Sequence, residues 1–510
     1  MKGTLLICFI STLLINAAQA QTARLNISIS NLKLPANVFI EDRTVSYADL
    51  KNSNTPIDLD SKGRGAVTID VPQAKYVMLN VYPSNSYNGL DYRLFLSPGD
   101  NMDIKIDFKA EKSRVTISGA GSANNRPDFN GFTDVWPDNK HVRDKTPYTA
   151  LNIFKKELTE NNKIFGRYVM SSQYKDNGLS QGRPSDVFMK VTRYNLDYYL
   201  AIKYFELKSA TLDDTHFSGP WQNVQDSLFR TIKLNNDDAL PAYNYQALLA
   251  TFMEREWERL LRQQEKDPAA FYKQWYHTTD AKEGERLFNE ERKNLLREKI
   301  INRYFSGKTA EHLYVELLKG NMRESNYKNI DVIFDHFKKK YPANPAVKWF
   351  RGPIADIAQK RKRTLTNKMV LLPGNGSKLN TVKEVAALFK GKTVFVDMWG
   401  TWCSPCREDI EKNTGALHAA LKGKNVQFLY IANFDLKHAE EWKKLIAYYG
   451  LEGNHILANE ALSKDIMAKT KSNGFPTYSI IRKDGTVVKA KSQYPLDSDV
   501  AVKELLDDAK

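Results

Sequence analysis

Cysteine is almost absent from this chain, which has three among its 510 residues. So small a number excludes a scaffold held together by many disulfides. Long hydrophobic runs are also absent after the first twenty residues, which excludes a polytopic membrane protein. Hydrophobic residues make up 42% and charged residues 26% of the chain, which is typical of soluble globular domains and excludes a disordered or fibrous protein.

Several catalytic and cofactor motifs are missing as well. The sequence contains no phosphate-binding loop or dinucleotide fingerprint, and no nucleophile elbow of the type Gly-x-Ser-x-Gly. Its eight histidines are scattered, with no pair at metal-ligand spacing beside cysteines or carboxylates. We therefore expect neither a bound cofactor nor a metal ion.

The first twenty residues have the layout of a secretory signal peptide. Lys2 gives a positively charged N-terminal region, and residues 5–15 are mostly apolar. Ala18-Gln19-Ala20 forms a cleavage site of the small-x-small type. The apolar run is too short for a spanning helix, although an uncleaved membrane anchor is the alternative. We expect residues 1–20 to be removed and the mature protein to be exported to the periplasm or cell envelope.

Basic residues outnumber acidic ones by 75 to 60, so the formal net charge is +15. Because a basic protein outside the cytoplasm rarely meets nucleic acid, we expect no nucleic-acid partner. Contact with anionic lipids or acidic glycans of the envelope surface is compatible with this charge. A solvated, lysine-rich surface is the simpler interpretation.

The spacing of apolar residues divides the mature chain into three segments. In residues 21–125 apolar and polar residues alternate between turn signals, which predicts a β-sandwich-like accessory domain. In residues 126–366 apolar residues recur at spacings of three and four, which predicts a mostly α-helical domain. Residues 367–510 alternate strands with helices and end in a hairpin and a helix, which predicts an α/β domain around one sheet.

The chemistry of the chain centres on Cys403-Ser404-Pro405-Cys406. This motif lies between a predicted buried strand, residues 393–399, and a predicted helix, residues 404–421. Free N–H groups and the helix dipole would stabilise a thiolate at Cys403. Cys406 lies one turn further on the same face, close enough to attack a mixed disulfide on Cys403. We predict an attacking thiolate and a resolving thiol; a structural or metal-binding pair is the alternative.

A family resemblance rests on two motifs. Residues 394–407 read VFVDMWGTWCSPCR and resemble the active-site segment of thioredoxins, and Gly474-Phe475-Pro476-Thr477 resembles their cis-proline loop. The insertion between the second strand and this loop, with the exported context, is similar to the TlpA/ResA-like branch of envelope thiol–disulfide oxidoreductases. The resemblance covers residues 367–510 and implies a thioredoxin-like fold there. More weakly, the N-terminal β segment, which ends in LFLSPGD at residues 94–100, resembles the accessory domain often placed before such modules.

The resemblance implies roles for residues close to the cysteines. Asp397 matches the buried acid of thioredoxins, where desolvation raises the carboxyl pKa and lets it take the Cys406 proton. A structural acid at the end of a strand is the alternative. Pro476, if its peptide bond is cis, would lie against the cysteines and present the backbone of Phe475 to a substrate strand. An ordinary turn proline is the alternative.

Substrate contacts follow from the same comparison. We expect Trp402, Phe475 and Thr477 to contact the substrate, although simple packing explains Trp402 equally well. Asp409 stands where TlpA/ResA-like proteins usually carry Glu, and Glu411 where they usually carry Pro. These departures leave the redox potential and the set of substrates open, but not the thiol chemistry.

The resemblance implies an exported thiol–disulfide oxidoreductase whose redox group is the Cys403–Cys406 disulfide. It would reduce protein disulfides and receive electrons from a membrane donor. A disulfide oxidase or isomerase is the alternative among enzymes. Outside enzymes, the alternative is an envelope binding protein that carries a redox-sensing thioredoxin-like module.

Overall fold

The computed structural model describes most of the chain after the predicted signal peptide, which lies outside the described residues. The described ranges are 22–32, 35–42, 54–83, 89–109, 114–126, residue 142, 145–170, 184–211, 219–323 and 326–509. The chain separates into two compact units, Met1–Tyr314 and Val315–Lys510. None of the helices in these ranges combines the length and apolar character that a membrane span requires.

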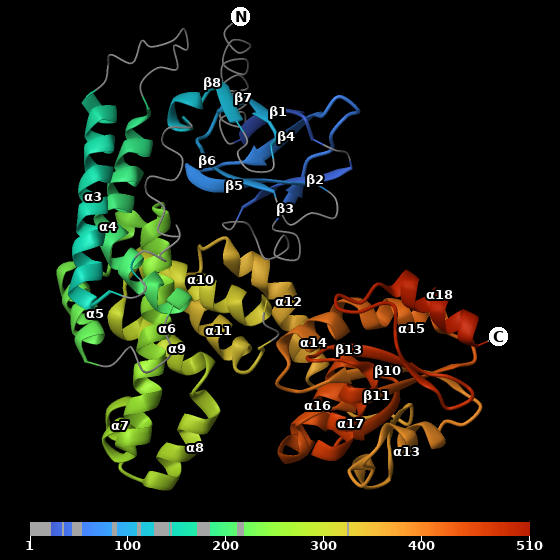
Figure 1. Ribbon diagram of the computed structural model, residues 1–510. Coiled ribbons are helices and arrows are strands. Elements are labelled where there is room, and N and C mark those ends of the chain that lie inside the picture. Colours follow the sequence, from blue (N-terminus) through green and yellow to red (C-terminus); the bar gives the residue numbers. More distant parts are fainter. Residues whose placement is uncertain are drawn as a thin grey trace, which may run out of the picture. The chain divides into compact units, whose positions relative to one another are not determined.

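The first unit begins with two four-stranded β-sheets (Figure 1). Their strand orders are β4-β1-β7-β8 and β3-β2-β5-β6, with β1 parallel to β7 and the other neighbouring pairs antiparallel. Inward-facing residues of both sheets, such as Leu25 and Leu79, belong to one buried core, which confirms the predicted sandwich-like all-β domain. The strands are β1 (Thr22–Ser30), β2 (Ala36–Glu41), β3 (Asn54–Pro56), β4 (Arg64–Asp70), β5 (Lys75–Pro83), β6 (Leu90–Leu96), β7 (Asn101–Asp107) and β8 (Arg114–Ala120).

Helices make up most of the described residues of this unit after β8, as the spacing of apolar residues predicts. Aromatic side chains fill much of their interior; the rings of Tyr198 on α4 and Tyr245 on α6, for example, lie 4.7 Å apart. The boundary between the two units falls within α10. The helices are α3 (Pro147–Met170), α4 (Asp186–Thr211), α5 (Pro220–Thr231), α6 (Tyr243–Lys266), α7 (Pro268–Tyr276), α8 (Ala281–Glu291), α9 (Asn294–Tyr304) and α10 (Gly307–Arg323).

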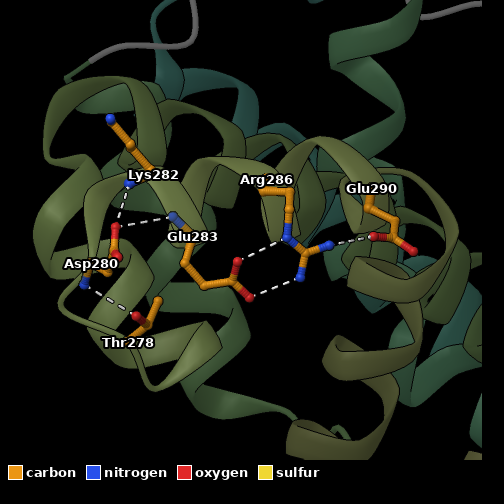
Figure 2. Close-up of polar contacts among 6 residues, drawn as sticks. All are labelled: Thr278, Asp280, Lys282, Glu283, Arg286 and Glu290. Atoms are coloured by element: carbon orange, nitrogen blue, oxygen red, sulfur yellow. Dashed lines mark hydrogen bonds and ion pairs between the residues drawn. The ribbon is translucent and has the colours of Figure 1, made fainter.

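Helix α8 illustrates how polar residues define a helix locally (Figure 2). The Asp280 carboxylate accepts hydrogen bonds from the backbone N–H groups of Lys282 and Glu283, at 2.8 and 3.2 Å, and so caps the helix start. One turn on, Arg286 lies between the carboxylates of Glu283 and Glu290. These charges are exposed, so they favour the helix by local pairing and contribute little to tertiary packing.

The second unit contains a six-stranded sheet with the order β14-β13-β10-β11-β12-β9. Strand β10 is parallel to β11 and antiparallel to β13, and it is buried along its whole length. The α/β prediction for this part of the chain is confirmed. The strands are β9 (Met369–Leu371), β10 (Thr393–Trp399), β11 (Val426–Ala432), β12 (Gly453–Leu457), β13 (Thr477–Ile481) and β14 (Val487–Lys489).

Helices cover both faces of this sheet. Val394, Val396 and Met398 of β10 pack with apolar residues of α13 and α17. On the opposite face, Phe395 packs with α15 and α18, and Trp399 packs with the cysteine motif and α16. The helices of the unit are α11 (Ile330–Lys340), α12 (Ala346–Lys360), α13 (Val382–Ala387), α14 (Ser404–Asp409), α15 (Gly415–Leu421), α16 (Ala439–Tyr449), α17 (Glu460–Thr470) and α18 (Ser498–Asp508).

The helix predicted after the cysteines is confirmed over residues 404–421. It contains a π-helical turn, Ile410–Thr414, between α14 and α15. Such turns occur mostly as single insertions within α-helices, often at functional sites. Glu411 lies in this turn.

Candidate active site

The two cysteines of the motif form a disulfide at the start of α14. Their Cα atoms are 5.3 Å apart, and both residues are buried, with exposed fractions of 4% for Cys403 and 1% for Cys406. Cys403 is the N-cap of the helix, and its sulfur accepts a hydrogen bond from the Cys406 backbone N–H at 3.2 Å. After reduction, this N–H and the positive end of the helix would favour a thiolate at Cys403 over one at Cys406.

Asp397 occupies the middle of β10, on the face of the sheet that also carries Phe395 and Trp399. It is 2% exposed, and its Oδ1 atom has no hydrogen-bond partner in the described part of the chain. Burial raises the pKa of this carboxyl well above its usual range, and the nearby charge of Asp409 raises it further. A carboxyl in these surroundings takes up a proton readily, because burial leaves its charged form with little stabilisation.

Two tyrosines lie directly opposite Asp397 on the neighbouring strands. Tyr430 pairs with it on β11 and Tyr478 pairs with it on β13. Both rings are buried, and burial together with the charge of Asp397 raises the pKa of each phenol. The Tyr430 hydroxyl lies 2.6 Å from Nε2 of His418. Burial lowers the pKa of this histidine. The two phenols opposite Asp397 are therefore neutral at physiological pH.

Asp409 ends α14 and is also buried. Its carboxylate accepts hydrogen bonds from the Tyr478 hydroxyl, the Asn413 side-chain amide and the Leu496 backbone N–H. The sequence marks Asp409 as a departure from related proteins but assigns it no place in the site. Tyr478 belongs to no motif, and sequence reasoning missed it.

A cluster of aromatic rings lies beside the buried disulfide, with Phe475 partly buried against the core that contains both cysteines. Trp402 is 52% exposed, and its indole N–H donates to the backbone oxygen of Asn433 at 3.0 Å. The Phe475 ring lies edge-on to Trp402 at 5.8 Å and edge-on to Phe434 at 6.1 Å. Phe434 is 51% exposed. We call Trp402, Phe434 and Phe475 the aromatic rim; sequence reasoning named the first and third but missed Phe434.

The backbone of Phe434 adopts an energetically unfavourable conformation. Its φ is 57°, in the left-handed region that residues with a Cβ disfavour. Fully buried residues flank it on both sides: the Asn433 side chain donates to the Trp399 and Ile431 oxygens, and the Asp435 carboxylate accepts from the N–H and hydroxyl of Thr401. The loop after β11 is therefore tied to the loop that carries the cysteines.

The second predicted motif begins β13. The Phe475–Pro476 peptide bond is cis, and Phe475 packs against the core that contains both cysteines. Thr477 is buried, and its hydroxyl donates to the Gly474 oxygen at 2.7 Å. Within the described ranges, no group of three or more His, Cys, Asp or Glu residues is arranged to hold a metal ion.

The sheet order and the Cys-x-x-Cys disulfide at a helix N-terminus are those of a thioredoxin-like α/β domain. Comparisons with known proteins agree. Residues 365–505 match the family model described as Redoxin. Over 100 residues the chain is 30% identical to the thiol-disulfide oxidoreductase ResA of Bacillus anthracis, covering 20% of this chain and 54% of ResA. The resemblance of this region to the TlpA/ResA-like branch of the thioredoxin family is therefore confirmed.

Other matches cover the same part of the chain. An uncharacterized protein of Haemophilus influenzae is 28% identical over 99 residues, which are 19% of this chain and 62% of that protein. The chain thus spans less than two thirds of the length of these curated relatives. Among solved structures, the thioredoxin domain of a thiol-disulfide oxidoreductase from Bacteroides vulgatus is 24% identical, with 24% of this chain and 84% of that chain covered and a TM-score of 0.21.

Proposed function

We propose that this protein is a thiol–disulfide oxidoreductase that exchanges electrons with protein cysteines through Cys403 and Cys406. The observation that carries the proposal is the buried disulfide whose first sulfur caps α14 and accepts the Cys406 N–H. A lone Cys-x-x-Cys pair is compatible with a structural role. A pair at a helix start, beside a buried acid and within an aromatic rim, favours redox chemistry. The similarity to ResA supports the same conclusion.

The proposed cycle begins with the reduced protein. The Cys403 thiolate attacks a substrate disulfide, and one substrate sulfur leaves as a thiolate. The sulfur of Cys406 then attacks Cys403, releases the second substrate sulfur and closes the Cys403–Cys406 disulfide. Asp397 takes the proton that Cys406 loses. Two electrons have passed to the substrate, and the product is the oxidised protein with a protonated Asp397.

We propose that the substrate binds over the aromatic rim. Pro476 and the backbone of Phe475 would border the substrate strand next to the disulfide, with Trp402 on the other side. Thr477 would position this loop through its hydroxyl bond to Gly474, since its buried side chain leaves little surface for direct contact. Exposed apolar rings beside a buried disulfide suit protein substrates better than small charged thiols.

The direction and location of the reaction belong to the same proposal. We propose that the protein is exported after cleavage following Ala20, that it works as a reductant in the periplasm or cell envelope, and that a membrane electron donor reduces it. The signal-like layout of residues 1–20 supports export, and the family resemblance of residues 367–510 implies the reducing direction and the membrane donor. Equilibration with glutathione buffers measures the direction, since about 30 mV corresponds to a tenfold change for a two-electron couple.

Insulin reduction tests the central claim. The mature chain should accelerate the reduction of insulin by dithiothreitol, and the variants Cys403→Ser and Cys406→Ser should each lose multiple turnover. If the mature chain forms its disulfide but shows no turnover on insulin or on envelope proteins, the oxidoreductase proposal fails. The alternative of a binding protein with a redox-sensing module would then be favoured.

A further inference from the structure

Residues 326–366 carry nearly half of the net positive charge of the chain. They contain ten basic residues and three acidic ones, which gives a formal charge of +7 out of +15 for the whole sequence. Each acid forms an ion pair with a basic residue of the same segment: Asp331 with Arg361 at 3.0 Å, Asp335 with Lys338 at 2.8 Å and Asp356 with Lys360 at 2.9 Å. The excess of positive charge therefore lies on the other basic residues of the segment.

Helix α12 separates apolar from cationic side chains. One face is buried and consists of Val347, Phe350, Ile354 and Ile357. The Phe350 ring lies 6.4 Å from the ring of Phe334, so this face packs on α11. The exposed face, at the spacing of a helix, consists of Lys348, Arg351, Ala355, Gln359 and Lys362. We call Lys348, Arg351 and Lys362 the cationic stripe.

Lys362 belongs to this face although α12 ends at Lys360. The backbone N–H groups of Arg361 and Lys362 still donate to the carbonyl oxygens of Ile357 and Gln359, at 3.0 and 3.1 Å, so the chain continues its helical course. At about 1.5 Å per residue, the cationic stripe is about 21 Å long.

The cationic stripe has no acidic partner. Within the described ranges its three side chains form no ion pair, and Asp356, the acid of α12, is bonded to Lys360. Neutral residues, Ala355 and Gln359, lie between the cations. A single small anion needs donors that converge on one point, whereas an exposed row of cations suits a surface that presents many anionic groups.

Bonds near the end of α12 attach the stripe to the redox domain. Arg363 donates to the backbone oxygen of Tyr448 on α16 at 3.0 Å. Lys360 reaches the carboxylate of Glu411, in the π-helical turn after the cysteines, at 3.3 Å. The cationic stripe and the disulfide therefore belong to the same compact unit.

We propose that the cationic stripe binds the anionic headgroups of a membrane surface. Phosphate-bearing lipids present many mobile anions in one plane, and each basic residue close to such a surface strengthens binding about five-fold. Three exposed lysines at the end of α11, residues 338–340, add to the positive potential before the start of α12.

This binding goes beyond the proposed thiol chemistry, but its consequence rests on the proposed function. Because the stripe and the disulfide are in one unit, a bound protein would hold Cys403 and Cys406 close to a membrane electron donor. The stripe itself is away from the aromatic rim in sequence and takes no part in thiol exchange.

Sedimentation with lipid vesicles tests the proposal. The full mature chain should bind vesicles of phosphatidylglycerol mixed with phosphatidylcholine, and it should not bind vesicles of phosphatidylcholine alone. The triple variant Lys348→Gln/Arg351→Gln/Lys362→Gln should bind the anionic vesicles about 100-fold more weakly. High salt should release the wild-type chain, because it screens the attraction.

A matched triple variant separates the stripe from the total charge of the chain. Lys464→Gln/Arg482→Gln/Lys489→Gln removes the same amount of charge from exposed positions on α17, after β13 and on β14. It should bind the anionic vesicles within about two-fold of the wild type, because charges further from the surface than a Debye length contribute little.

The outcomes decide the proposal. Loss of binding in the stripe variant alone supports it. Equal loss in both triple variants, equal binding to neutral vesicles, or binding to an acidic polysaccharide or protein in place of anionic vesicles would overturn it. Insulin reduction in solution is measured in parallel and should be unchanged in the stripe variant. If the wild type reduces insulin without binding anionic vesicles, the stripe proposal fails and the proposed function stands; if it binds vesicles without reducing insulin, the reverse holds.

Discussion

The Glu411 carboxylate accepts a hydrogen bond from the Tyr327 hydroxyl at 2.6 Å, across 84 positions of sequence. Lys360 at the end of α12 reaches the same carboxylate at 3.3 Å. Helices before residue 367 are thereby bonded to the π-helical turn that follows the cysteines. Glu411 thus anchors the preceding helices to the helix that carries the cysteines.

This anchoring predicts a difference between two fragments. Residues 367–510 contain the whole sheet and should fold and keep dithiol activity, whereas residues 326–510 should resist urea to a higher concentration because they retain α11, α12 and Tyr327. Glu411→Ala should lower the stability of the longer fragment by about 1 kcal/mol, since the pair is only partly buried. The same substitution in the shorter fragment is the control and should have almost no effect on the unfolding midpoint.

The two cysteine variants should behave differently toward substrates. Cys406→Ser leaves an attacking thiolate with nothing to resolve the mixed disulfide, so substrate should remain attached. Cys403→Ser removes the attacking thiolate and should capture nothing. Non-reducing gels of envelope extract would display higher-mass adducts for the first variant alone. The opposite pattern would reverse the roles that we assign to the two sulfurs.

Asp397 should make the oxidised protein less stable as the pH rises. Its folded pKa lies well above the ordinary value of 3.8, so between that value and the folded pKa the native state holds a proton that the unfolded state has lost. The free energy of unfolding therefore falls with increasing pH across this window. Asp397→Asn should remove this slope and be the more stable protein at neutral pH. Urea unfolding at a series of pH values measures the free energy of unfolding of both proteins. If this free energy changes with pH in the same way in the wild type and in Asp397→Asn, the prediction is contradicted.

Phe434 allows backbone strain and side-chain function to be separated. At a φ of 57°, glycine should be more stable than alanine by about 1 kcal/mol. Both Phe434→Gly and Phe434→Ala remove the exposed ring, so both should lower kcat/KM for a protein disulfide several-fold and leave reduction by dithiothreitol unchanged. Leu388→Ala, which removes an exposed apolar side chain after α13, serves as the control. Equal stability of the glycine and alanine variants would argue against strain at this position.

Local patterns account for much of what the sequence predicts correctly. Alternating apolar residues indicate the strands of the first unit. The apolar residues on both sides of Asp397 indicate a strand buried on both faces. The Cys403–Cys406 spacing and the loop around Pro476 are recognisable because each motif spans a few neighbouring residues. Such features depend on short-range geometry, which a sequence displays directly.

Other features depend on which segments meet, and that information is not local. Tyr478 and Asp409 are 69 positions apart, and they meet because β13 pairs with β10 in a register that places the tyrosine beneath α14. The left-handed backbone of Phe434 follows from hydrogen bonds that fix both of its neighbours, and nothing in its own side chain favours that conformation.

Periodicity and motifs thus predict the order of the elements, the thioredoxin-like character of residues 367–510 and the pair of cysteines to which we assign the chemistry. They do not predict the π-helical turn after the cysteines, the hydrogen bond between Tyr327 and Glu411, or the second buried acid whose charge influences Asp397. Periodicity and turn residues act over a few positions. Burial, charge and hydrogen bonding at the site depend on sheet order and register, which bring together residues far apart in the chain.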